Sequence, residues 1–499
     1  MANEYRLGYN FVPMDHRRTK IVATLGPACS DLESLRALLS AGVDVVRING
    51  SHGQHAQHAT AIARVRALSA ELARPVGILF DLQGPKIRLG TFDGPPVAIA
   101  QGATFALSVG RPAADDELPC DYPYLDRDVR VGAPLLIDDG QLTCTVTHVA
   151  PGRVEARAEH AGFIGQRKGI NLPESDVSAP AISDKDRADV LFAVAQKVDF
   201  IAMSFVRRAQ DINALRELID DACGHQAIIA KIEKPQALDN LEAILEASWG
   251  VMVARGDLGV ELSASLVPMA QKRIIRAARR LGKPVITATQ MLDSMTRNPR
   301  PTRAEASDVA NAVLDGTDAV MLSQETAVGT YPVETVRMMG EIIDAVECDE
   351  AYDGKKLPPI ADASAVGQVL AHAACTVAEA LGAPAIATYT ETGHIAQLVS
   401  QRRPHVPIVA FAATPGLEHR LCLVWGVLAI TGTDINDCED RQGALDALLM
   451  RRKLARKDDH VVLMVGAPNG RTGSTNSIMV HRIGEKPRPA QGLYEAARL

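Results

Sequence analysis

Eight short apolar runs, each followed by polar or charged residues, recur between residues 20 and 325 of this 499-residue chain. Near-continuous apolar runs of this length are typical of strands that are buried on both faces, as in a parallel sheet. The runs occupy residues 20–26, 43–50, 76–82, 198–206, 227–233, 249–257, 283–290 and 318–325. Because helix-like stretches lie between them, the pattern predicts a (β/α)8 TIM barrel of the α/β class.

The clearest helix signal follows the first run. Ser30 and Glu33 have the spacing of a capping box, and leucines at 32, 35, 38 and 39 continue at helical spacing. Gly42 stands directly after them as a stop signal. We therefore expect a helix that begins at Ser30 and ends before Gly42.

Two parts of the chain fall outside the barrel pattern. More than 100 residues separate the third and fourth runs, and residues 88–178 alternate apolar and polar positions between turn signals at 138–140 and 151–152. This stretch predicts an inserted small β-domain, well placed to act as a lid. After about residue 347, the runs 384–390, 407–413 and 460–466 alternate with helix-like stretches and predict a separate α/β domain.

Composition excludes several classes of protein. The net charge of −7 and an aromatic content of 4% argue against a nucleic-acid or anionic-membrane surface. No run of 18 uncharged apolar residues exists, so no membrane span is predicted, and the N-terminus lacks the apolar stretch of a signal peptide. Eight scattered cysteines without a CxxC argue against a disulfide framework or a zinc site. We expect a soluble cytoplasmic enzyme.

Polar side chains gather at the C-terminal ends of the runs, where barrel enzymes place their catalytic groups. They are Arg47, Asn49, Asp81, Ser204, Arg207, Lys231, Glu233, Arg255, Asp257, Thr289, Gln290, Ser323 and Glu325. Glu233 and Asp257 end neighbouring strands, so both can reach one hard cation such as Mg²⁺. Arg47, Arg255 and Lys231 would hold phosphate or carboxylate oxygens. The alternative is a set of solvated strand ends with surface salt bridges, and spacing alone does not fix the reaction.

Several strings are more specific than this spacing. They are RRTKIVATLGPA (17–28), VRINGSHG (46–53), IDDG (137–140), KGINLP (168–173), VARGDLGVE (253–261), ITATQML (286–292) and the long string at 299–332. Together they resemble the pyruvate kinase family from about residue 17 to 347. The resemblance implies transfer of the phosphoryl group of phosphoenolpyruvate to ADP, giving pyruvate and ATP through an enolate that is then protonated, the final step of glycolysis.

The resemblance also implies a domain organisation that matches the pattern above. It divides the chain into an N-terminal segment (1–16), a barrel domain A (17–85 and 179–347), a β-barrel lid domain B (86–178) and an α/β regulatory domain C (348–499). Members of the family are usually homotetramers through their A and C domains, so a homotetramer is expected.

Roles for individual residues follow from the same resemblance. Glu233 and Asp257 are similar to the protein ligands of the divalent metal, Mg²⁺ or Mn²⁺. Lys231 resembles the catalytic lysine that stabilises the transferring phosphoryl group and the enolate. Arg47 resembles the arginine that grips the phosphoryl group. Thr289 resembles the residue on the side where the enolate is protonated, where a hydroxyl would position a water relay.

The remaining roles are those of binding and support. The backbone amides of Arg255, Gly256 and Asp257 resemble the pocket for the substrate carboxylate, and the glycine allows that close approach. His52, Arg88 and Lys168 resemble nucleotide contacts, although each could be an ordinary solvated side chain. Ser204, Ser323 and Glu325 are expected to support the site from behind the residues that touch the substrate.

One segment departs from the common pattern of the family, which binds K⁺. Asn49, Ser51 and Asp81 are present, but Leu82 stands where Thr is usual and Lys86 replaces a Glu. This resembles the K⁺-independent branch, because an ammonium can supply the charge of K⁺ and Leu82 removes a hydroxyl ligand. The alternative is that Lys86 is a solvated hinge charge and K⁺ still binds.

Other departures concern loops. Gly50 stands where Phe is usual, and Lys234-Pro235 replaces Asn-His after the metal ligand. In the C-terminal domain Thr390, Thr392 and Gly393 resemble a loop that binds a sugar-phosphate effector, although His394 and Ile395 replace small hydroxyl residues. The stretch 466–478 could close over such an effector. Both loops could instead be turns at a subunit interface.

Two other functions stay open at this point. A metal-dependent pyruvate aldolase or lyase on a similar barrel would use the same enolate chemistry without a nucleotide, but KGINLP and the 299–332 string count against it. A catalytically inactive regulatory relative is the second alternative. Such a protein would have lost a metal ligand or the lysine, yet Lys231, Glu233 and Asp257 are all present.

Overall fold

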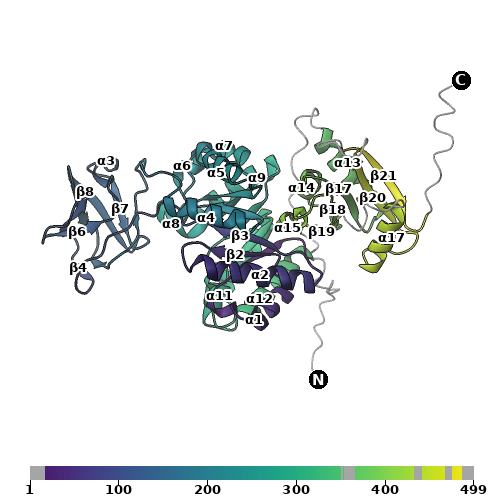
Figure 1. Ribbon diagram of the computed structural model, residues 1–499, viewed down its shortest axis with the longest axis horizontal. Helices are drawn as coiled ribbons and strands as arrows, with labels where there is room; N and C mark the ends of the chain where they lie inside the picture. The colour runs from purple at the N-terminus through teal and green to yellow at the C-terminus, as the bar shows by residue number, and fades with distance from the viewer. Residues whose placement is uncertain (1–16, 350–351, 353–365, 432–440, 467–474, 486–499) are drawn as a thin grey trace.

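The computed structural model describes residues 17–349, 352, 366–431, 441–466 and 475–485, and every structural statement below concerns these residues. The chain forms three units in a row, with the inserted β-domain at one end, the barrel in the middle and the C-terminal unit at the other end (Figure 1). Within the described residues, no helix combines the length and the apolar character needed to cross a bilayer.

The central unit is a closed barrel of eight parallel strands, which confirms the predicted fold class. The strands follow one another around the barrel in the order β1-β16-β15-β14-β13-β12-β3-β2. They are β1 (Lys20–Thr24), β2 (Val45–Asn49), β3 (Gly77–Asp81), β12 (Phe200–Met203), β13 (Ala227–Ile232), β14 (Gly250–Ala254), β15 (Val285–Ala288) and β16 (Ala319–Leu322). Each lies inside one of the apolar runs, because both faces of such a strand are covered.

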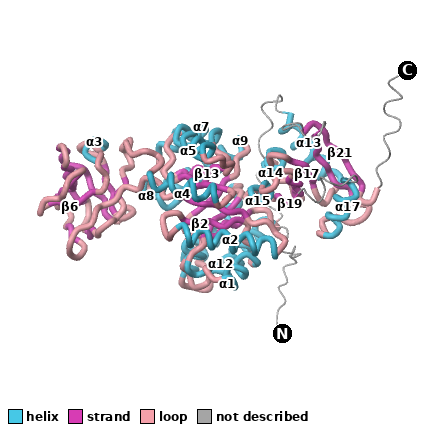
Figure 2. Tube along the Cα trace, in the orientation of Figure 1, coloured by secondary structure: helices cyan, strands magenta, loops and turns pink. Residues whose placement is uncertain are grey.

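Helices surround the barrel strands on the outside (Figure 2). The longer ones are α1 (Leu32–Ser40), α2 (His55–Glu71), α4 (Asp184–Ala195), α5 (Ala209–Asp221), α7 (Leu241–Ala247), α9 (Val267–Leu281), α10 (Arg303–Asp315) and α12 (Pro332–Glu347). Short helical segments lie in the connecting loops, namely η2 (Pro27–Cys29), α6 (Pro235–Asp239), α8 (Arg255–Glu261), η3 (Ala264–Leu266), η4 (Asp293–Thr296) and α11 (Gln324–Ala327). The apolar stripe of each long helix packs onto the strands, as Leu35, Leu38 and Leu39 of α1 show.

The cap of α1 differs from the prediction. The helix begins at Leu32, and Asp31 is its N-cap, accepting a hydrogen bond from the Ser34 amide at 2.8 Å. The Ser30 hydroxyl turns back and donates to the Pro27 carbonyl at 3.1 Å, so the expected Ser30–Glu33 capping box is wrong. The short segment η2 ends directly before Ser30 and directs the chain so that the next residue enters the helix.

The inserted unit has its own core and is built almost wholly of strands and loops (Figure 2). A six-stranded sheet has the order β11-β7-β8-β9-β5-β6, and a two-stranded sheet pairs β10 with β4. The elements are β4 (Val97–Ile99), β5 (Thr104–Val109), β6 (Glu117–Cys120), α3 (Leu125–Asp128), β7 (Pro134–Ile137), β8 (Leu142–Ala150), β9 (Arg153–Ala158), β10 (Gly162–Ile164) and β11 (Ile170–Asn171).

The chain enters and leaves the inserted unit through two paired segments. Arg88 and Gly169 form an antiparallel bridge, and the Ile170 amide donates to the Ile87 carbonyl at 2.9 Å. We call residues 84–88 and 168–172 the lid hinge. Because two backbone segments carry the whole unit, motion of the unit must bend both of them together.

The C-terminal unit is an α/β domain, as predicted. In its described residues the strand order is β19-β18-β17-β20-β21, with β21 antiparallel to β20 and the other pairs parallel. Its elements are α13 (Val366–Leu381), β17 (Ile386–Thr390), α14 (His394–Gln401), β18 (Ile408–Ala412), α15 (Leu417–Leu421), β19 (Val427–Thr431), α17 (Arg441–Arg451), β20 (His460–Gly466) and β21 (Thr475–Arg482). Strands β19 and β21 were not expected from the sequence.

The C-terminal unit packs against the end of the barrel at which the strands begin. Lys20 opens β1, and its ammonium donates to the Val427 carbonyl at 2.8 Å. Arg403 Nη2 lies 3.1 Å from Asp318 Oδ1, directly before β16. The opposite end of the barrel, where the strands finish, therefore stays available for a site beneath the inserted unit.

The two candidate caps of α1 are separable by mutation. Asp31→Ala removes the acceptor of the Ser34 amide, whereas Ser30→Ala leaves that amide bonded. At about 1 kcal/mol for a lost N-cap, we expect amides in the first turn of α1 to exchange about fivefold faster in Asp31→Ala. Hydrogen-exchange mass spectrometry of residues 32–40 measures this. Faster exchange in Ser30→Ala than in Asp31→Ala would contradict the assignment.

Candidate active site

A buried cluster of charges lies where the barrel strands end. Lys231, in β13, is at its centre, and its Nζ lies 2.9 Å from Glu233 Oε1 and 3.3 Å from Asp81 Oδ1. The same ammonium donates to the Ser204 hydroxyl at 2.7 Å. Its three N–H groups thus have three acceptors, which hold the side chain in one direction.

Arg47 joins this cluster from β2, which pairs with β3, the strand that ends in Asp81. Its Nε and Nη2 each lie 2.7 Å from Asp81 Oδ2, and Nη1 donates to the Thr24 hydroxyl at 3.0 Å. Asp81 is only 1% exposed, and burial raises the pKa of its carboxyl, but Lys231 and Arg47 outweigh burial and lower it overall. Asp81 therefore stays ionised and fixes both cations at once.

The same argument holds for Lys231. Burial lowers the pKa of its ammonium, but the carboxylates of Asp81 and Glu233 raise it more, so the net pKa lies above the usual value. The lysine is thus a permanent cation at neutral pH. It can stabilise negative charge on a bound group, and it is not a general base.

Glu233 and Asp257 carry the chemistry of a metal site. Glu233 is fully buried, and its Oε2 accepts the Phe205 amide at 2.6 Å, while its Oε1 faces the Lys231 ammonium at 2.9 Å. Burial raises the pKa of Glu233, Lys231 opposes this, and the charge of nearby Asp257 raises the pKa further. Two carboxylates near enough for one to raise the pKa of the other fit a divalent cation, which would relieve their repulsion.

These two side chains are the whole carboxylate supply of that position. Among the described residues, no group of three or more His, Cys, Asp or Glu side chains forms a metal site. A cation held by Glu233 and Asp257 would therefore complete its coordination with substrate oxygens and water, which is the habit of Mg²⁺.

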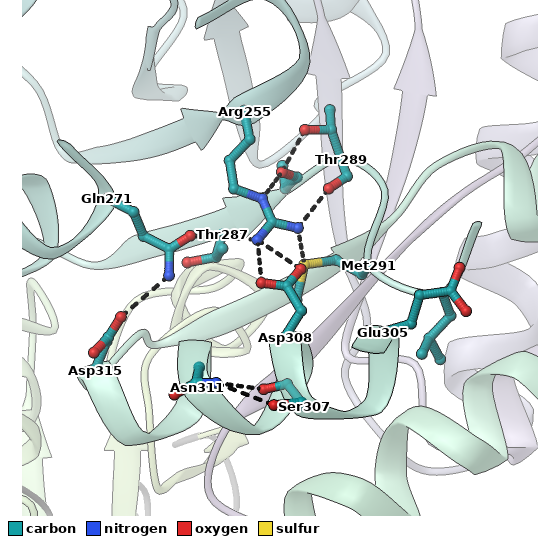
Figure 3. Close-up of polar contacts among 12 residues, drawn as sticks. Arg255, Gln271, Thr287, Thr289, Met291, Glu305, Ser307, Asp308, Asn311 and Asp315 are labelled. Carbon is teal, nitrogen blue, oxygen red and sulfur yellow. Dashed lines mark hydrogen bonds and ion pairs between the residues drawn. The ribbon is translucent and has the colours of Figure 1, made fainter. Parts of the chain in front are cut away.

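The side chain of Arg255 is committed to the protein itself (Figure 3). Its Nε donates to the Ala288 carbonyl at 3.1 Å, and its Nη2 donates to the Thr289 carbonyl at 2.6 Å. Its Nη1 pairs with Asp308 of α10 at 2.7 Å. Sequence spacing suggested that this guanidinium would hold substrate oxygens, but in the structure it holds the loop after β15.

Thr289 is the residue that this clamp positions. Its backbone has φ 72°, and Gln290 follows with φ 52°, both in the left-handed region that β-branched and bulky residues avoid. Such a conformation costs about 1–3 kcal/mol and persists only where neighbours enforce it. The Thr289 hydroxyl donates to the Ala288 carbonyl at 2.6 Å and accepts the Gly256 amide at 2.8 Å, so it points toward the start of α8.

Comparison with known proteins places this geometry in a family. The model for "Pyruvate kinase, barrel domain" matches residues 16–336, and the model for "Pyruvate kinase, alpha/beta domain" matches residues 368–481. Pyruvate kinase of Geobacillus stearothermophilus is 43% identical over 489 residues, which are 96% of this chain and 82% of that protein. Pyruvate kinase of Mycobacterium tuberculosis is 44% identical over 471 residues, which are 94% of this chain and 99% of that protein.

A solved structure agrees with these sequence matches. A pyruvate kinase from Cryptosporidium parvum aligns with a TM-score of 0.87 at 35% identity, covering 94% of this chain and 97% of that one. The chain belongs to the pyruvate kinase family. It is a phosphotransferase of the pyruvate kinase type, and the aldolase and inactive-relative alternatives are set aside.

In this member of the pyruvate kinase family, the lid hinge brings further charges toward the metal position. Lys86 Nζ lies 3.9 Å from Asp257 Oδ1 and 3.5 Å from Asp139 Oδ1 of the inserted unit. Lys168 Nζ lies 2.9 Å from Asp138. Arg88 Nη1 donates to the Arg167 carbonyl at 3.2 Å. Lys86, Arg88 and Lys168, the three cationic side chains predicted beside the site, therefore all lie on the lid hinge.

The residues predicted to form a K⁺ site, or its replacement, make their bonds within the protein. Asp81 is bound by Arg47 and Lys231, while the Asn49 side chain accepts the Ser51 amide at 3.1 Å. Leu82 is buried, and its carbonyl accepts the Ser204 hydroxyl at 2.7 Å. The ion pairs of Lys86 run to Asp139 and Asp257, so its role as a substitute for K⁺ stays a prediction.

Three predicted supporting or binding residues lie at the margin of the site. The Glu325 carboxylate is buried and accepts the Ser323 amide at 2.7 Å and the Leu292 amide at 3.2 Å, which ties the ends of β16 and β15 together. His52 is exposed, and its amide donates to the Asn49 carbonyl at 3.3 Å. These contacts hold the loops at the ends of β2, β15 and β16 in place.

Gly50 has a structural reason that the sequence alone did not reveal. A Cβ at this position would lie 2.8 Å from the Asp81 carbonyl oxygen and 3.0 Å from the Phe80 ring. The Gly50 amide donates to that same carbonyl at 2.8 Å, so the two backbones are in direct contact. The Phe80 ring fills the space beside the loop, and no larger residue fits without moving Asp81.

The hydroxyl groups of the predicted effector loop form hydrogen bonds within the loop itself. The Thr390 hydroxyl accepts the Gly393 amide at 2.8 Å, and the Thr392 hydroxyl accepts the His394 amide at 3.4 Å. Gly393 has φ 86° and forms the N-cap of α14. Most of the second predicted stretch, 467–474 within 466–478, lies outside the described residues.

Sequence reasoning missed Glu261, Asn171 and Asp308. Glu261 is buried at the end of α8, Asn171 is buried in β11, and Asp308 anchors Arg255. All three stand in the family-like strings, Glu261 in VARGDLGVE, Asn171 in KGINLP and Asp308 in the string at 299–332. Their roles become visible only once the chain is folded, because the partners of all three come from distant segments.

The contact at Gly50 generates a test. Gly50→Ala forces the Asp81 carbonyl or the Phe80 ring to move, so we expect the barrel to lose about 1–3 kcal/mol of unfolding free energy. Gly259→Ala is the control, since its Cβ would meet only Val267 at an ordinary 3.6 Å. Chemical denaturation followed by circular dichroism compares the two. A Gly50→Ala variant as stable as Gly259→Ala would show that the loop can relax.

Proposed function

We propose that the buried cluster transfers the phosphoryl group of phosphoenolpyruvate to ADP, which yields pyruvate and ATP. The observation that carries this assignment is the Lys231 ammonium, held by Asp81, Glu233 and Ser204 beside a pair of carboxylates. A fixed cation next to a metal position is what phosphoryl transfer requires, since positioning and electrostatic stabilisation supply most of the catalysis.

Glu233 and Asp257 would hold Mg²⁺ or Mn²⁺. When bound there, the ion would neutralise the developing charge on the oxygens of the substrate. The support for this role is the full burial of the Glu233 carboxylate, which raises its pKa, and the nearby charge of Asp257, which raises it further. No further protein carboxylate is needed, because the substrate supplies oxygens of its own.

Lys231 and Arg47 would act on the transferring group. Arg47 presents a planar guanidinium whose orientation is set by Asp81 and Thr24, so it can grip phosphoryl oxygens without first reorganising. Lys231 stays protonated and stabilises negative charge on the phosphoryl group and then on the enolate oxygen.

Thr289 would serve the proton-transfer half of the reaction. A threonine hydroxyl is a poor acid, but this one is aimed by the Arg255 clamp at the Gly256 amide. We assign it to hold a water that delivers the proton to the enolate carbon. The backbone amides of Arg255, Gly256 and Asp257 would donate hydrogen bonds to the substrate carboxylate. The Gly256 amide would then give up its present hydrogen bond to the Thr289 hydroxyl.

The nucleotide would be held between the barrel and the lid. His52 is exposed on the loop after β2, and Arg88 and Lys168 lie on the lid hinge, so closure of the inserted unit would bring them together over ADP. Lys168 is paired with Asp138 in this conformation and would release it on closing.

We further propose that the enzyme works without K⁺. Leu82 offers no side-chain oxygen, and Lys86 places an ammonium 3.9 Å from Asp257, where a second cation would be repelled.

The protein is expected to be a cytoplasmic homotetramer. A groove of about 860 Å³ along α7 and α9 exposes Leu266 and Met269, a surface suited to a second copy of the chain.

Regulation by a sugar phosphate is the remaining part of the proposal. Thr390, Thr392 and Gly393 lie at the C-terminal end of β17, where ligands of parallel α/β sheets bind. Their hydroxyls already bond to the loop itself, so an effector would have to replace those two hydrogen bonds.

The lysine has the most direct test. Lys231→Met retains the volume of the side chain but removes the cation, and we expect kcat to fall at least 10²–10³-fold. Lys272→Met is the matched control, because Lys272 also pairs with a buried aspartate, Asp315, but on the outside of the barrel. Pyruvate formation from phosphoenolpyruvate and ADP is measured for both. A Lys231→Met enzyme with near-parental kcat would overturn the assignment.

The K⁺ proposal is tested on Lys86. We expect the parent enzyme to form pyruvate with Mg²⁺ alone and to gain less than twofold when K⁺ is added, because the ammonium already supplies the charge. Lys86→Glu should lose activity in K⁺-free buffer and recover part of it with K⁺. A parent enzyme that is inactive until K⁺ is added would keep the kinase assignment but refute the role of Lys86.

A further inference from the structure

A second buried carboxylate lies beside the metal position and has no place in the mechanism. The Glu261 side chain is wholly buried, and its Oε1 accepts the Asn171 amide group at 2.8 Å and forms an ion pair with Lys234. A buried carboxylate is stable only when it is paired and hydrogen-bonded, and breaking such a pair costs about 3–5 kcal/mol. The three residues therefore act as one unit, the Lys234–Glu261–Asn171 triad.

The triad joins three segments that are far apart in the sequence. Lys234 directly follows the proposed metal ligand Glu233. Glu261 ends α8, which carries the other proposed ligand, Asp257, in its first turn. Asn171 lies in β11, in the return segment of the lid hinge. One carboxylate thus ties both metal-ligand segments to the hinge.

A second contact leads from Lys234 to Glu233. The Lys234 ammonium lies 6.0 Å from the centre of the Phe205 ring, in a cation–π arrangement. The amide of the same Phe205, whose φ is 56°, donates to Glu233 Oε2 at 2.6 Å. Displacement of Lys234 would therefore disturb the Phe205 hydrogen bond, which orients the Glu233 carboxylate together with Lys231.

The hinge side of the triad is loosely packed. A cavity of about 30 Å³, room for roughly one water, is lined by Asn171, Lys234, Phe205 and the hinge residues Lys86 and Ile87. Asn171 Oδ1 and Glu261 Oε2 are buried and accept no hydrogen bond within the described residues. The hinge can thus shift against the triad more easily than against the rest of the barrel.

We propose that Lys234, Glu261 and Asn171 are positioning residues that set the spacing of Glu233 and Asp257 and so tie metal affinity to the lid hinge. The inference rests on the proposed metal site. It predicts that loss of Lys234 weakens metal binding, because the two ligand segments lose their common anchor. Simple electrostatics predicts the opposite sign, since removing a nearby positive charge should strengthen the binding of a cation.

This difference in sign makes the test sharp. Mn²⁺ binding to the full chain is titrated by electron paramagnetic resonance of the free ion, without substrate. We expect Kd to rise about tenfold in Lys234→Met and several-fold in Asn171→Ala, and to return close to parental in Lys234→Arg. Lys272→Met, which breaks another lysine pair with a buried aspartate on the outside of the barrel, should leave Kd unchanged.

Hydrogen exchange adds a readout that a merely structural role would not move. In the parent chain, Mn²⁺ should slow exchange of the Ile170 amide, which bonds to Ile87 in the hinge. In Lys234→Met this slowing should disappear, although Mn²⁺ is added to saturation. Hinge exchange that responds equally to Mn²⁺ in parent and variant would refute the coupling.

The outcomes separate the inference from the function on which it rests. If Glu233→Gln and Asp257→Asn bind Mn²⁺ like the parent, the proposed metal site itself is wrong. If those two variants lose Mn²⁺ while Lys234→Met binds it with parental or higher affinity, the metal site stands and the positioning role is overturned.

Discussion

The ionised Asp81 carboxylate is the contact on which the arrangement of the site depends. It is 1% exposed and pairs with Arg47 from one neighbouring strand and Lys231 from further around the barrel. A buried charge without a partner costs several kcal/mol, so the three must be brought together or none is tolerated. Closure of the parallel barrel is what brings them together, since β2 and β13 reach the same rim only when the strand order is complete.

The rim is rigid where bonds change and compliant where the lid attaches. Arg255 holds the strained backbone of Thr289 with hydrogen bonds to two carbonyls and an ion pair to Asp308. The inserted unit, by contrast, is joined through two paired backbone segments beside a small cavity. The strained backbone of Thr289 persists because the surrounding barrel is tightly packed. Opening and closing of the inserted unit, by contrast, needs the looser packing at the lid hinge.

The fold was largely predictable because its strongest signal is local. Strands buried on both faces must be apolar throughout, so β1 and β13 can be recognised in the sequence as apolar runs. A polar residue directly after such a run marks the C-terminal end of the barrel. The same logic placed Lys231 and Glu233 at one end of the barrel. What it could not supply was partner choice, because that depends on the positions of side chains from distant segments.

Each miss has a physical cause of this kind. The cap of α1 fell to Asp31 because the turn before it directs Ser30 to Pro27. Strand β21 has mixed burial at one edge of the sheet, so its sequence TNSIMVHR contains no continuous apolar run. Strand β19, at the other edge, has the short apolar run VLAIT, which the strand prediction left out. Glu261 had a clear position in the sequence but no visible reason, since its partners Lys234 and Asn171 come from segments far along the chain.

A crystal structure of the protein with Mn²⁺ and phosphoenolpyruvate, without ADP, tests the central claim most directly, because the anomalous scattering of Mn²⁺ locates the ion. We predict one strong peak bound by the carboxylates of Glu233 and Asp257, with the substrate phosphoryl group within hydrogen-bond distance of Lys231 Nζ and Arg47. A Mn²⁺ peak away from these two carboxylates, or a phosphoryl group out of reach of Lys231, would contradict the account.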